Sequence, residues 1–156
     1  MLIAASVYER AVEIAVAAAR AVQVGDPARP GKHLGPLASR MQYEKVQSCI
    51  AAGISEGAQL LVGGPGRPEG YPTGFYVRPT LFGNVHNQMS IAREEIFGPV
   101  LCLMRYATLD EAVAIANDTP YGLAAYVQCS DPQQAHALAR RLRGQPCRLS
   151  PHPAST

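Results

Sequence analysis

The sequence predicts an α/β fold in which parallel strands alternate with helices. Apolar runs of strand length at 100–104 and 123–127 alternate with helical patterns at 108–116 and 132–142. This spacing is typical of a right-handed βαβ unit, and an unbroken apolar run indicates a parallel strand covered on both faces. The 156 residues are 47% hydrophobic and 17% charged, which excludes a disordered chain and supplies the core of about one domain.

The first expected helix covers residues 6–22. Its apolar side chains form one wide arc, and its charged side chains lie opposite. The arc comprises Val7, Ala11, Ile14, Ala15, Ala18 and Val22, with Val12 and Val16 beside it. Such a wide arc predicts neighbours on more than one side of the helix. Glycines and prolines between 25 and 36 then predict an irregular segment.

A second helix is expected to begin at Ser39. Gln42, three residues later, completes the pattern of a capping box, and Gly57 suits the C-terminal end of the helix. The predicted buried stripe consists of Val46, Cys49, Ile50, Gly53 and Ile54. A short strand at 59–62 and a turn region rich in glycine and proline at 63–74 follow.

Both helices of the second half have clear start signals. Thr108 and Glu111 form another capping box, and Asp131 is a cap followed by Pro132 in the first turn. From 146 to 156 the chain has three prolines and no apolar periodicity, so we expect an unstructured tail.

Composition excludes several classes of function. The net charge of +2 and the 6% aromatic content, without tryptophan, argue against nucleic-acid binding. No apolar run is long enough to cross a membrane, and residues 1–6 lack a secretory signal, so we expect a cytoplasmic protein. The four cysteines and four histidines are scattered, which predicts neither a disulfide framework nor a metal site.

Two glycine-rich stretches resemble phosphate loops only superficially. The stretch at 63–70 has its third glycine out of register and prolines that remove amide donors. Gly31-Lys32 is followed by His33 instead of Ser or Thr. Both stretches are interpreted as turns.

The segment 91–100, IAREEIFGPV, is the best candidate for a functional site. Glu94 and Glu95 are followed by Phe97 and then by Gly-Pro, directly before an expected buried strand. This order places a carboxylate and an aromatic ring at the mouth of a parallel sheet. The alternative is that both carboxylates are solvated or paired with Arg93, and that Phe97 packs in the core.

Several ordered motifs resemble the aldehyde dehydrogenase family. Besides 91–100 they are NDTPYGLAA at 117–125, YVRPTLF at 76–82, GDP at 25–27 and GPL at 35–37. The resemblance runs from about residue 2 to residue 145. It implies a three-layer α/β, parallel-sheet fragment of an aldehyde-dehydrogenase-like catalytic domain at 1–145, followed by a divergent tail at 146–156.

The family oxidises aldehydes to carboxylates with NAD or NADP. By resemblance, the carboxylate of Glu95 would accept hydrogen bonds from the nicotinamide ribose, and Phe97 would press on the nicotinamide. Gln42 and Lys45 would lie near the same ribose in an alternative cofactor pose. The capping box also explains Gln42, and a solvated helix position also explains Lys45.

The resemblance implies no catalytic residue within this chain. The family's nucleophilic cysteine, in its Gly-Gln-x-Cys context, and its glutamate base precede the matched region. Gly144-Gln145-Pro146-Cys147 imitates that context but follows the last helix, so we expect no catalytic role for Cys147. Cys49, Cys102 and Cys129 are interpreted as ordinary buried residues. The isolated chain is therefore expected to be inactive.

Two other functions remain open. The chain could be a non-enzymatic interaction module, or half of a split protein, that docks onto a missing N-terminal part or forms a homo-oligomer through exposed apolar surface. An unrelated α/β binding protein would require the ordered motif matches to be chance.

Overall fold

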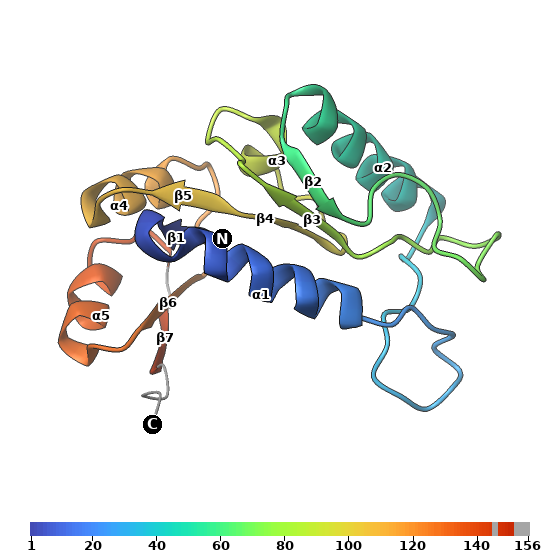
Figure 1. The fold of residues 1–156 in the computed structure, drawn as a ribbon, viewed down its shortest axis with the longest axis horizontal. Coiled ribbons are helices and arrows are strands. Elements are labelled where there is room, and N and C mark those ends of the chain that lie inside the picture. The colour runs from blue at the N-terminus through green and yellow to red at the C-terminus, as the bar shows by residue number, and fades with distance from the viewer. Residues whose placement is uncertain (145–146, 152–156) are drawn as a thin grey trace. The chain divides into compact units, whose positions relative to one another are not determined.

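The computed structural model describes residues 1–144 and the backbone of residues 147–151 (Figure 1). The chain divides into two compact units, Met1–Arg105 and Tyr106–Thr156. Each unit combines helices with a parallel pair of strands, which confirms the predicted α/β class.

The first unit is built around a mixed sheet. Its elements are β1 (Leu2–Ala4), the 3-10 turn η1 (Ala5–Val7), α1 (Tyr8–Ala21), α2 (Arg40–Ser55), β2 (Gln59–Val62), β3 (Thr80–Gly83), α3 (Ser90–Arg93), β4 (Val100–Cys102) and β5 (Met104–Tyr106), whose last residue is the first of the second unit. The main sheet has the order β2-β3-β4, in which β3 pairs antiparallel with β2 and parallel with β4. Strands β1 and β5 form a separate pair.

Strand β3 is buried on both faces. Leu81 packs in a cluster with residues of α1, whereas Phe82 packs in another cluster with Val46 and Ile50 of α2. Because successive side chains of a strand point to opposite faces, α1 and α2 cover opposite sides of the sheet (Figure 1). The first unit therefore has three layers, helix, sheet and helix, as the resemblance implied.

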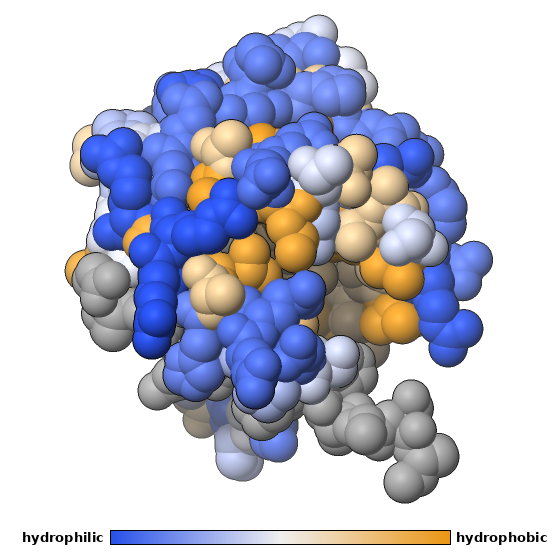
Figure 2. Space-filling model, turned by 90° about the vertical axis from the view of Figure 1, so that its left-hand side faces the viewer, coloured by the Kyte–Doolittle hydropathy of each residue, from blue (hydrophilic) through white to orange (hydrophobic). Residues whose placement is uncertain are grey.

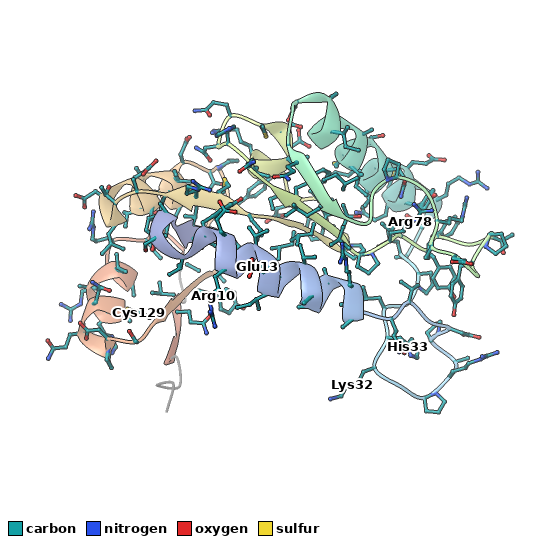
Figure 3. The ribbon with its side chains drawn as sticks, viewed as in Figure 1. Arg10, Glu13, Lys32, His33, Arg78 and Cys129 are labelled. Atoms are coloured by element: carbon teal, nitrogen blue, oxygen red, sulfur yellow. The ribbon has the colours of Figure 1, made fainter. Side chains whose placement is uncertain are left out.

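Helix α1 buries a narrower face than its sequence suggested. Its inner face consists of Tyr8 and the small or branched residues Ala11, Val12, Ala15, Val16 and Ala19. Three residues of the predicted arc, Val7, Ile14 and Val22, are instead 51%, 61% and 41% exposed. Arg10 and Glu13 are exposed on the same helix, as expected from its pattern (Figure 3). Within the first unit, α1 thus packs against the sheet along one face.

Tyr8 anchors α1 to the sheet and was not part of the predicted arc. Its side chain is 3% exposed. The hydroxyl donates to the Leu103 carbonyl oxygen at 3.3 Å and accepts from the Asn84 amide at 2.9 Å. The guanidinium of Arg105 lies 4.5 Å from the centre of the Tyr8 ring. One phenol at the start of α1 therefore binds two backbone groups, the buried Leu103 carbonyl and the part-buried Asn84 amide.

Helix α2 begins and ends where its sequence predicted. The Ser39 hydroxyl accepts from the Gln42 amide at 3.2 Å, and Gly57 follows the helix with a φ of +93°. The Glu56 carboxylate accepts from the Ser90 amide at 2.8 Å and so ties the end of α2 to the start of α3. Strand β2 has the predicted bounds, Gln59–Val62.

The second unit contains a βαβ motif. Its elements are α4 (Leu109–Asn117), β6 (Ala125–Cys129), α5 (Pro132–Ala139) and β7 (Cys147–Pro151). The Thr108 hydroxyl caps α4 and the Asp131 carboxylate caps α5, as predicted. Strands β6 and β7 are parallel, and α5 connects them.

The expected strands of the second half need correction. The run 100–104 is interrupted at Leu103, so β4 joins β3 while β5 joins β1. Leu101 is 42% exposed, so β4 is not covered on both faces. The strand expected at 123–127 begins two residues later, at Ala125. Its described parallel partner is β7.

The expectation of an unstructured tail from 146 to 156 is wrong for Cys147–Pro151. These residues form β7 and pair with β6 in continuous register. Strand pairing uses backbone amides and carbonyls, so it does not require the apolar periodicity that this segment lacks. Residues 145–146 and 152–156 of the expected tail lie outside the described residues.

Hydrophobic side chains also reach the surface. Figure 2 shows such residues among hydrophilic ones on one face of the molecule. The most exposed large ones are Leu123, Met41, Tyr126 and Phe97, at 83%, 78%, 76% and 70%. None of the described helices has the length and apolar character needed to span a membrane.

We predict that Tyr8→Phe lowers the free energy of unfolding by about 1 kcal/mol, because it removes the hydroxyl that binds the Asn84 amide and the Leu103 carbonyl, of which the carbonyl keeps the Val85 amide as a donor. Urea unfolding measures this change. The matched control is Tyr126→Phe, at a ring that is 76% exposed, and it should change stability by less than about 0.5 kcal/mol. Equal stabilities of Tyr8→Phe and the unmodified chain would show that the Tyr8 hydroxyl does not anchor α1 to the sheet.

Candidate functional site

The candidate site is the loop between α3 and β4. It holds Glu95 and Phe97, whose side chains both project to solvent. Phe97 is 70% exposed and has a φ of +52°, a left-handed backbone conformation that is uncommon for a residue other than glycine. The alternative that Phe97 packs in the core is therefore wrong. An exposed ring on a strained backbone is a feature typical of functional sites.

Two side chains of α2 hold this loop. The Gln42 amide nitrogen donates to the carbonyl oxygens of Ile96 and Phe97, at 2.9 and 3.0 Å. The Lys45 ammonium donates to the carbonyl oxygen of Glu95 at 3.2 Å. The structure thus brings together all four residues that the sequence analysis singled out, and it does so through the backbone of the loop.

The capping-box interpretation of Gln42 is confirmed in part. Its backbone amide donates to the Ser39 hydroxyl, as in a capping box. Its side chain does not complete the box but reaches the loop, 54 residues away in sequence. Lys45 is exposed on α2, as its alternative interpretation predicted, and also donates to the Glu95 carbonyl.

Packing against the core and against α2 also holds the loop in place. Ile96 is 8% exposed and belongs to the core cluster that includes Val46 and Phe82. Gly98 lies so close to α2 that a Cβ atom there would be 2.7 Å from a methyl carbon of Val46. The Thr80 amide donates to the Pro99 carbonyl at 2.8 Å, which joins the end of the loop to β3. The loop is therefore held along its length.

A hollow of about 260 Å³ opens beside the loop. Glu94 and Phe97 line one side of it, and Val100, Cys102 and Met104 line another. The sequence analysis missed these last three residues, of which Val100 and Cys102 share one face of β4 and Met104 begins β5. Glu95, the predicted ribose ligand, is exposed on the loop but does not line this hollow.

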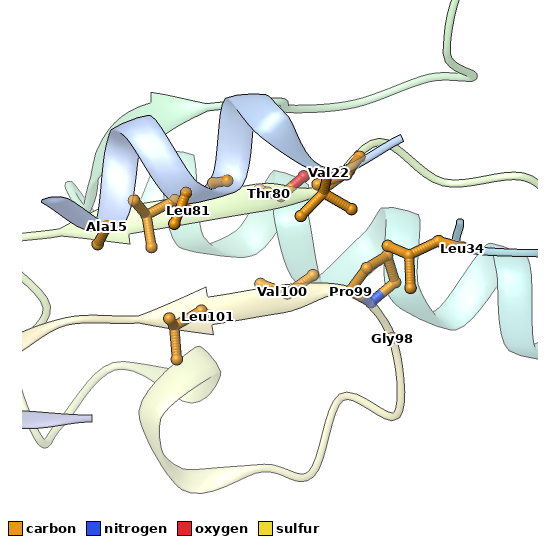
Figure 4. Close-up of a pocket in the computed structure, with 12 residues that line it drawn as sticks. Ala15, Val22, Leu34, Thr80, Leu81, Gly98, Pro99, Val100 and Leu101 are labelled. Atoms are coloured by element: carbon orange, nitrogen blue, oxygen red, sulfur yellow. The ribbon is translucent and has the colours of Figure 1, made fainter. Parts of the chain in front are cut away.

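A second hollow of about 410 Å³ lies between α1 and strands β3 and β4 (Figure 4). Ala15, Ala18 and Ala19 are small enough to leave space above the sheet, and Val22, Leu34 and Leu101 complete an apolar lining. This groove can accept apolar groups, but it offers no set of polar side chains for chemistry.

The cysteines of the first unit are poor nucleophiles. Burial raises the pKa of the Cys102 thiol to about 11, and its sulfur lies 3.5 Å from the Ile91 carbonyl oxygen. Burial, followed by the nearby Glu94 carboxylate, also raises the pKa of Cys49. A thiol attacks only as its thiolate, so neither group is prepared for nucleophilic catalysis at neutral pH. The described residues contain no group of three or more side chains that could hold a metal ion.

Comparison with known proteins decides the family. A profile described as "Aldehyde dehydrogenase family" matches residues 1–145.

The chain belongs to the aldehyde dehydrogenase family.

Curated relatives agree with this assignment. The 3-succinoylsemialdehyde-pyridine dehydrogenase of a Pseudomonas species is 48% identical over 143 residues, which are 92% of this chain and 30% of the relative. A putative aldehyde dehydrogenase of Staphylococcus saprophyticus is 54% identical over 121 residues, which are 78% of this chain and 26% of the relative. The chain therefore spans less than a third of the length of these aldehyde dehydrogenases.

Solved aldehyde dehydrogenases have the same fold. Aldehyde dehydrogenase C from Pseudomonas syringae, solved as a mutant with NAD⁺ and octanal, aligns with a TM-score of 0.94 and 48% identity over 100% of this chain and 32% of its own. The Mycobacterium tuberculosis aldehyde dehydrogenase, solved with NAD⁺, aligns with a TM-score of 0.92 and 42% identity over 97% of this chain and 31% of its own. NAD⁺ is thus the cofactor seen in related structures.

We predict that alkylation of Cys102 by iodoacetamide is slow at pH 8 and accelerates as the pH rises toward about 11, because the thiolate fraction grows with pH up to the pKa. Mass spectrometry of the labelled peptides measures the rate, and Cys102→Ser identifies the signal. A rate that reaches its plateau below pH 9 would show that burial does not hold this thiol in its protonated form.

Proposed function

We propose that this chain forms the nicotinamide-ribose side of an NAD(P)-dependent aldehyde dehydrogenase, an enzyme class that oxidises aldehydes to carboxylates. The observation that carries the proposal is the exposed pair Glu95 and Phe97, held on a loop that Gln42 and Lys45 bind to α2. Family membership and the NAD⁺ in related structures support it.

The chemistry of the loop fits such a cofactor. An ionised carboxylate only accepts hydrogen bonds, so Glu95 suits the two hydroxyls of a ribose. The Phe97 ring is 70% exposed and is free to lie against a flat heterocycle. Both groups lie on one short, well-held segment, which favours a single orientation of what they bind.

We assign to this chain the binding and orientation of the cofactor. The nicotinamide supplies the hydride acceptor when it is bound. Glu95 would hold the ribose hydroxyls, and Phe97 would limit the positions of the ring. Lys45 and Gln42 would keep the loop in place or meet the ribose in a second pose. The raised pKa values of Cys49 and Cys102 argue against either thiol as the nucleophile.

A direct test is titration of the chain with nicotinamide mononucleotide, followed by NMR at the Glu95 and Phe97 amides. We expect a dissociation constant on the order of 1 mM, because the chain offers only the ribose and nicotinamide contacts. Glu95→Ala should weaken binding roughly tenfold, since it removes a charge-assisted hydrogen bond.

Glu13→Ala is the matched control, because it removes an exposed carboxylate of α1, on the other side of the sheet, and it should change the constant less than about twofold. Equal losses in both variants, or no perturbation at either amide, would refute the proposed role of Glu95. An aldehyde oxidation that depends on Cys49 or Cys102 would refute the assignment of this chain to cofactor orientation alone.

The apolar groove between α1 and β4 favours docking as a second candidate function. Leu101 is 42% exposed at its edge, and the curated relatives carry more than two thirds of their length outside the matched region. We propose that the groove accepts the complementary part of an aldehyde dehydrogenase catalytic domain, because that part must cover the same sheet in a complete domain.

Co-expression with the unmatched part of the Pseudomonas relative, followed by affinity capture, tests this docking. Leu101→Glu should reduce capture at least tenfold, because it places a charge in the groove. Leu123→Glu, at a leucine that is 83% exposed in the second unit, should leave capture unchanged. Self-association in sedimentation without capture would identify a second copy as the occupant and overturn the proposal.

A further inference from the structure

The proposed function does not explain what keeps the backbone of Phe97 in a left-handed conformation. A left-handed conformation is unfavourable for phenylalanine, so the surrounding structure must stabilise it. Core packing does not, because the side chain is 70% exposed. The stabilising contacts must therefore act on the backbone of residue 97 and on its packed neighbours, Ile96 and Gly98.

The contacts of Gln42 meet this requirement. Its side-chain nitrogen donates to two consecutive carbonyl oxygens, those of Ile96 and Phe97. In an extended chain, consecutive carbonyls point to opposite sides. The relative orientation of these two depends on φ and ψ of Phe97, which lies between them. An extended Phe97 would turn the two carbonyls away from each other, so one amide group that reaches both, at 2.9 and 3.0 Å, opposes the change of Phe97 to the extended conformation.

We propose that Gln42 is a positioning residue, whose two hydrogen bonds hold Phe97 in the left-handed conformation and so present its ring to the nicotinamide. This inference deepens the proposed function and rests on it for the identity of the ligand. A primary amide has two N–H donors on one atom, which matches the two carbonyls. Lys45 donates to the carbonyl of Glu95, one residue before those that Gln42 binds. The two side chains of α2 therefore bind three consecutive carbonyls of the loop.

The first turns of α2, which carry Gln42, are held by a helix cap and by core packing. Gln42 lies in the first turn of α2, where its backbone amide donates a hydrogen bond to the Ser39 hydroxyl at 3.2 Å. Val46, one turn further along α2, is fully buried and contacts the loop at Gly98. The donor atom of Gln42 is therefore fixed relative to the loop before any ligand binds, which reduces the conformational cost of binding.

Gln42→Glu tests the role with almost no change in size. A carboxylate cannot donate to the two carbonyls, so Phe97 should leave the left-handed region. The Cα and Cβ chemical shifts of Phe97 and its amide–Hα coupling report φ without any ligand. The dissociation constant for nicotinamide mononucleotide should rise about tenfold, as expected when the competent conformer falls to about a tenth of the population. The thermal midpoint of the chain measures global stability.

Met41→Glu is the matched control. It adds the same charge at the neighbouring position of α2, where the side chain is 78% exposed, and it should leave the Phe97 reporters and the binding constant unchanged. If Gln42→Glu fails to fold, Gln42→Leu, which removes both donors without adding charge, is judged by the same measurements.

The readouts separate this inference from the proposed function. Unchanged Phe97 shifts in a folded Gln42 variant overturn the positioning role, whatever the ligand does. Changed shifts, with no ligand perturbation of Glu95 even in the unmodified chain, support the positioning of Phe97 and overturn the proposed cofactor site.

Discussion

The burial of strand β3 on both faces is the constraint on which the first unit depends. With Leu81 packed beneath α1 and Phe82 packed beneath α2, the two helices have to lie on opposite sides of the sheet. The connection from β3 to its parallel neighbour β4 passes along the α2 side, because its residues Ile91 and Ile96 pack in the cluster that includes Val46 of α2. The first turns of α2 then meet that loop, and Gln42 and Lys45 bind its carbonyls. The candidate site is thus a consequence of the layer order.

The parts of the fold that the sequence predicted well are those with local causes. The side chain before each of three helices accepts a hydrogen bond from a backbone amide in the first turn, at Ser39, Thr108 and Asp131. Such caps can be predicted because they depend on a few neighbouring residues. Strand β3 was missed because Thr80–Gly83 is short, follows a proline and shows no alternation, although all four residues are buried. Tyr8 was missed because its partners are about 76 and 95 residues away in sequence. Strand β7 was missed because pairing through the backbone leaves no pattern in the side chains.

In the candidate site, too, the residues of a local motif could be predicted, whereas contacts between distant segments could not. The resemblance to a family identified Glu95 and Phe97 from a contiguous motif, and Gln42 and Lys45 from matching positions. It could not predict that Gln42 and Lys45 bind the backbone of the same loop, since those contacts arise only when α2 and β4 are packed against one sheet. It also assigned no role to Glu94, Cys102 or Met104, which line the hollow beside Phe97 through strand alternation and loop geometry.

The close approach of Gly98 to Val46 has a consequence for how the site tolerates change. The backbone of the loop rests directly on the two methyl groups of Val46, with no side chain of its own in between. Val46 therefore acts as a spacer that sets the separation between the axis of α2 and the loop between α3 and β4. A bulkier residue at either position would widen that separation, and a smaller one at 46 would leave a void beneath it. During divergence the two positions are then expected to vary as a pair, in compensating volume, more readily than alone.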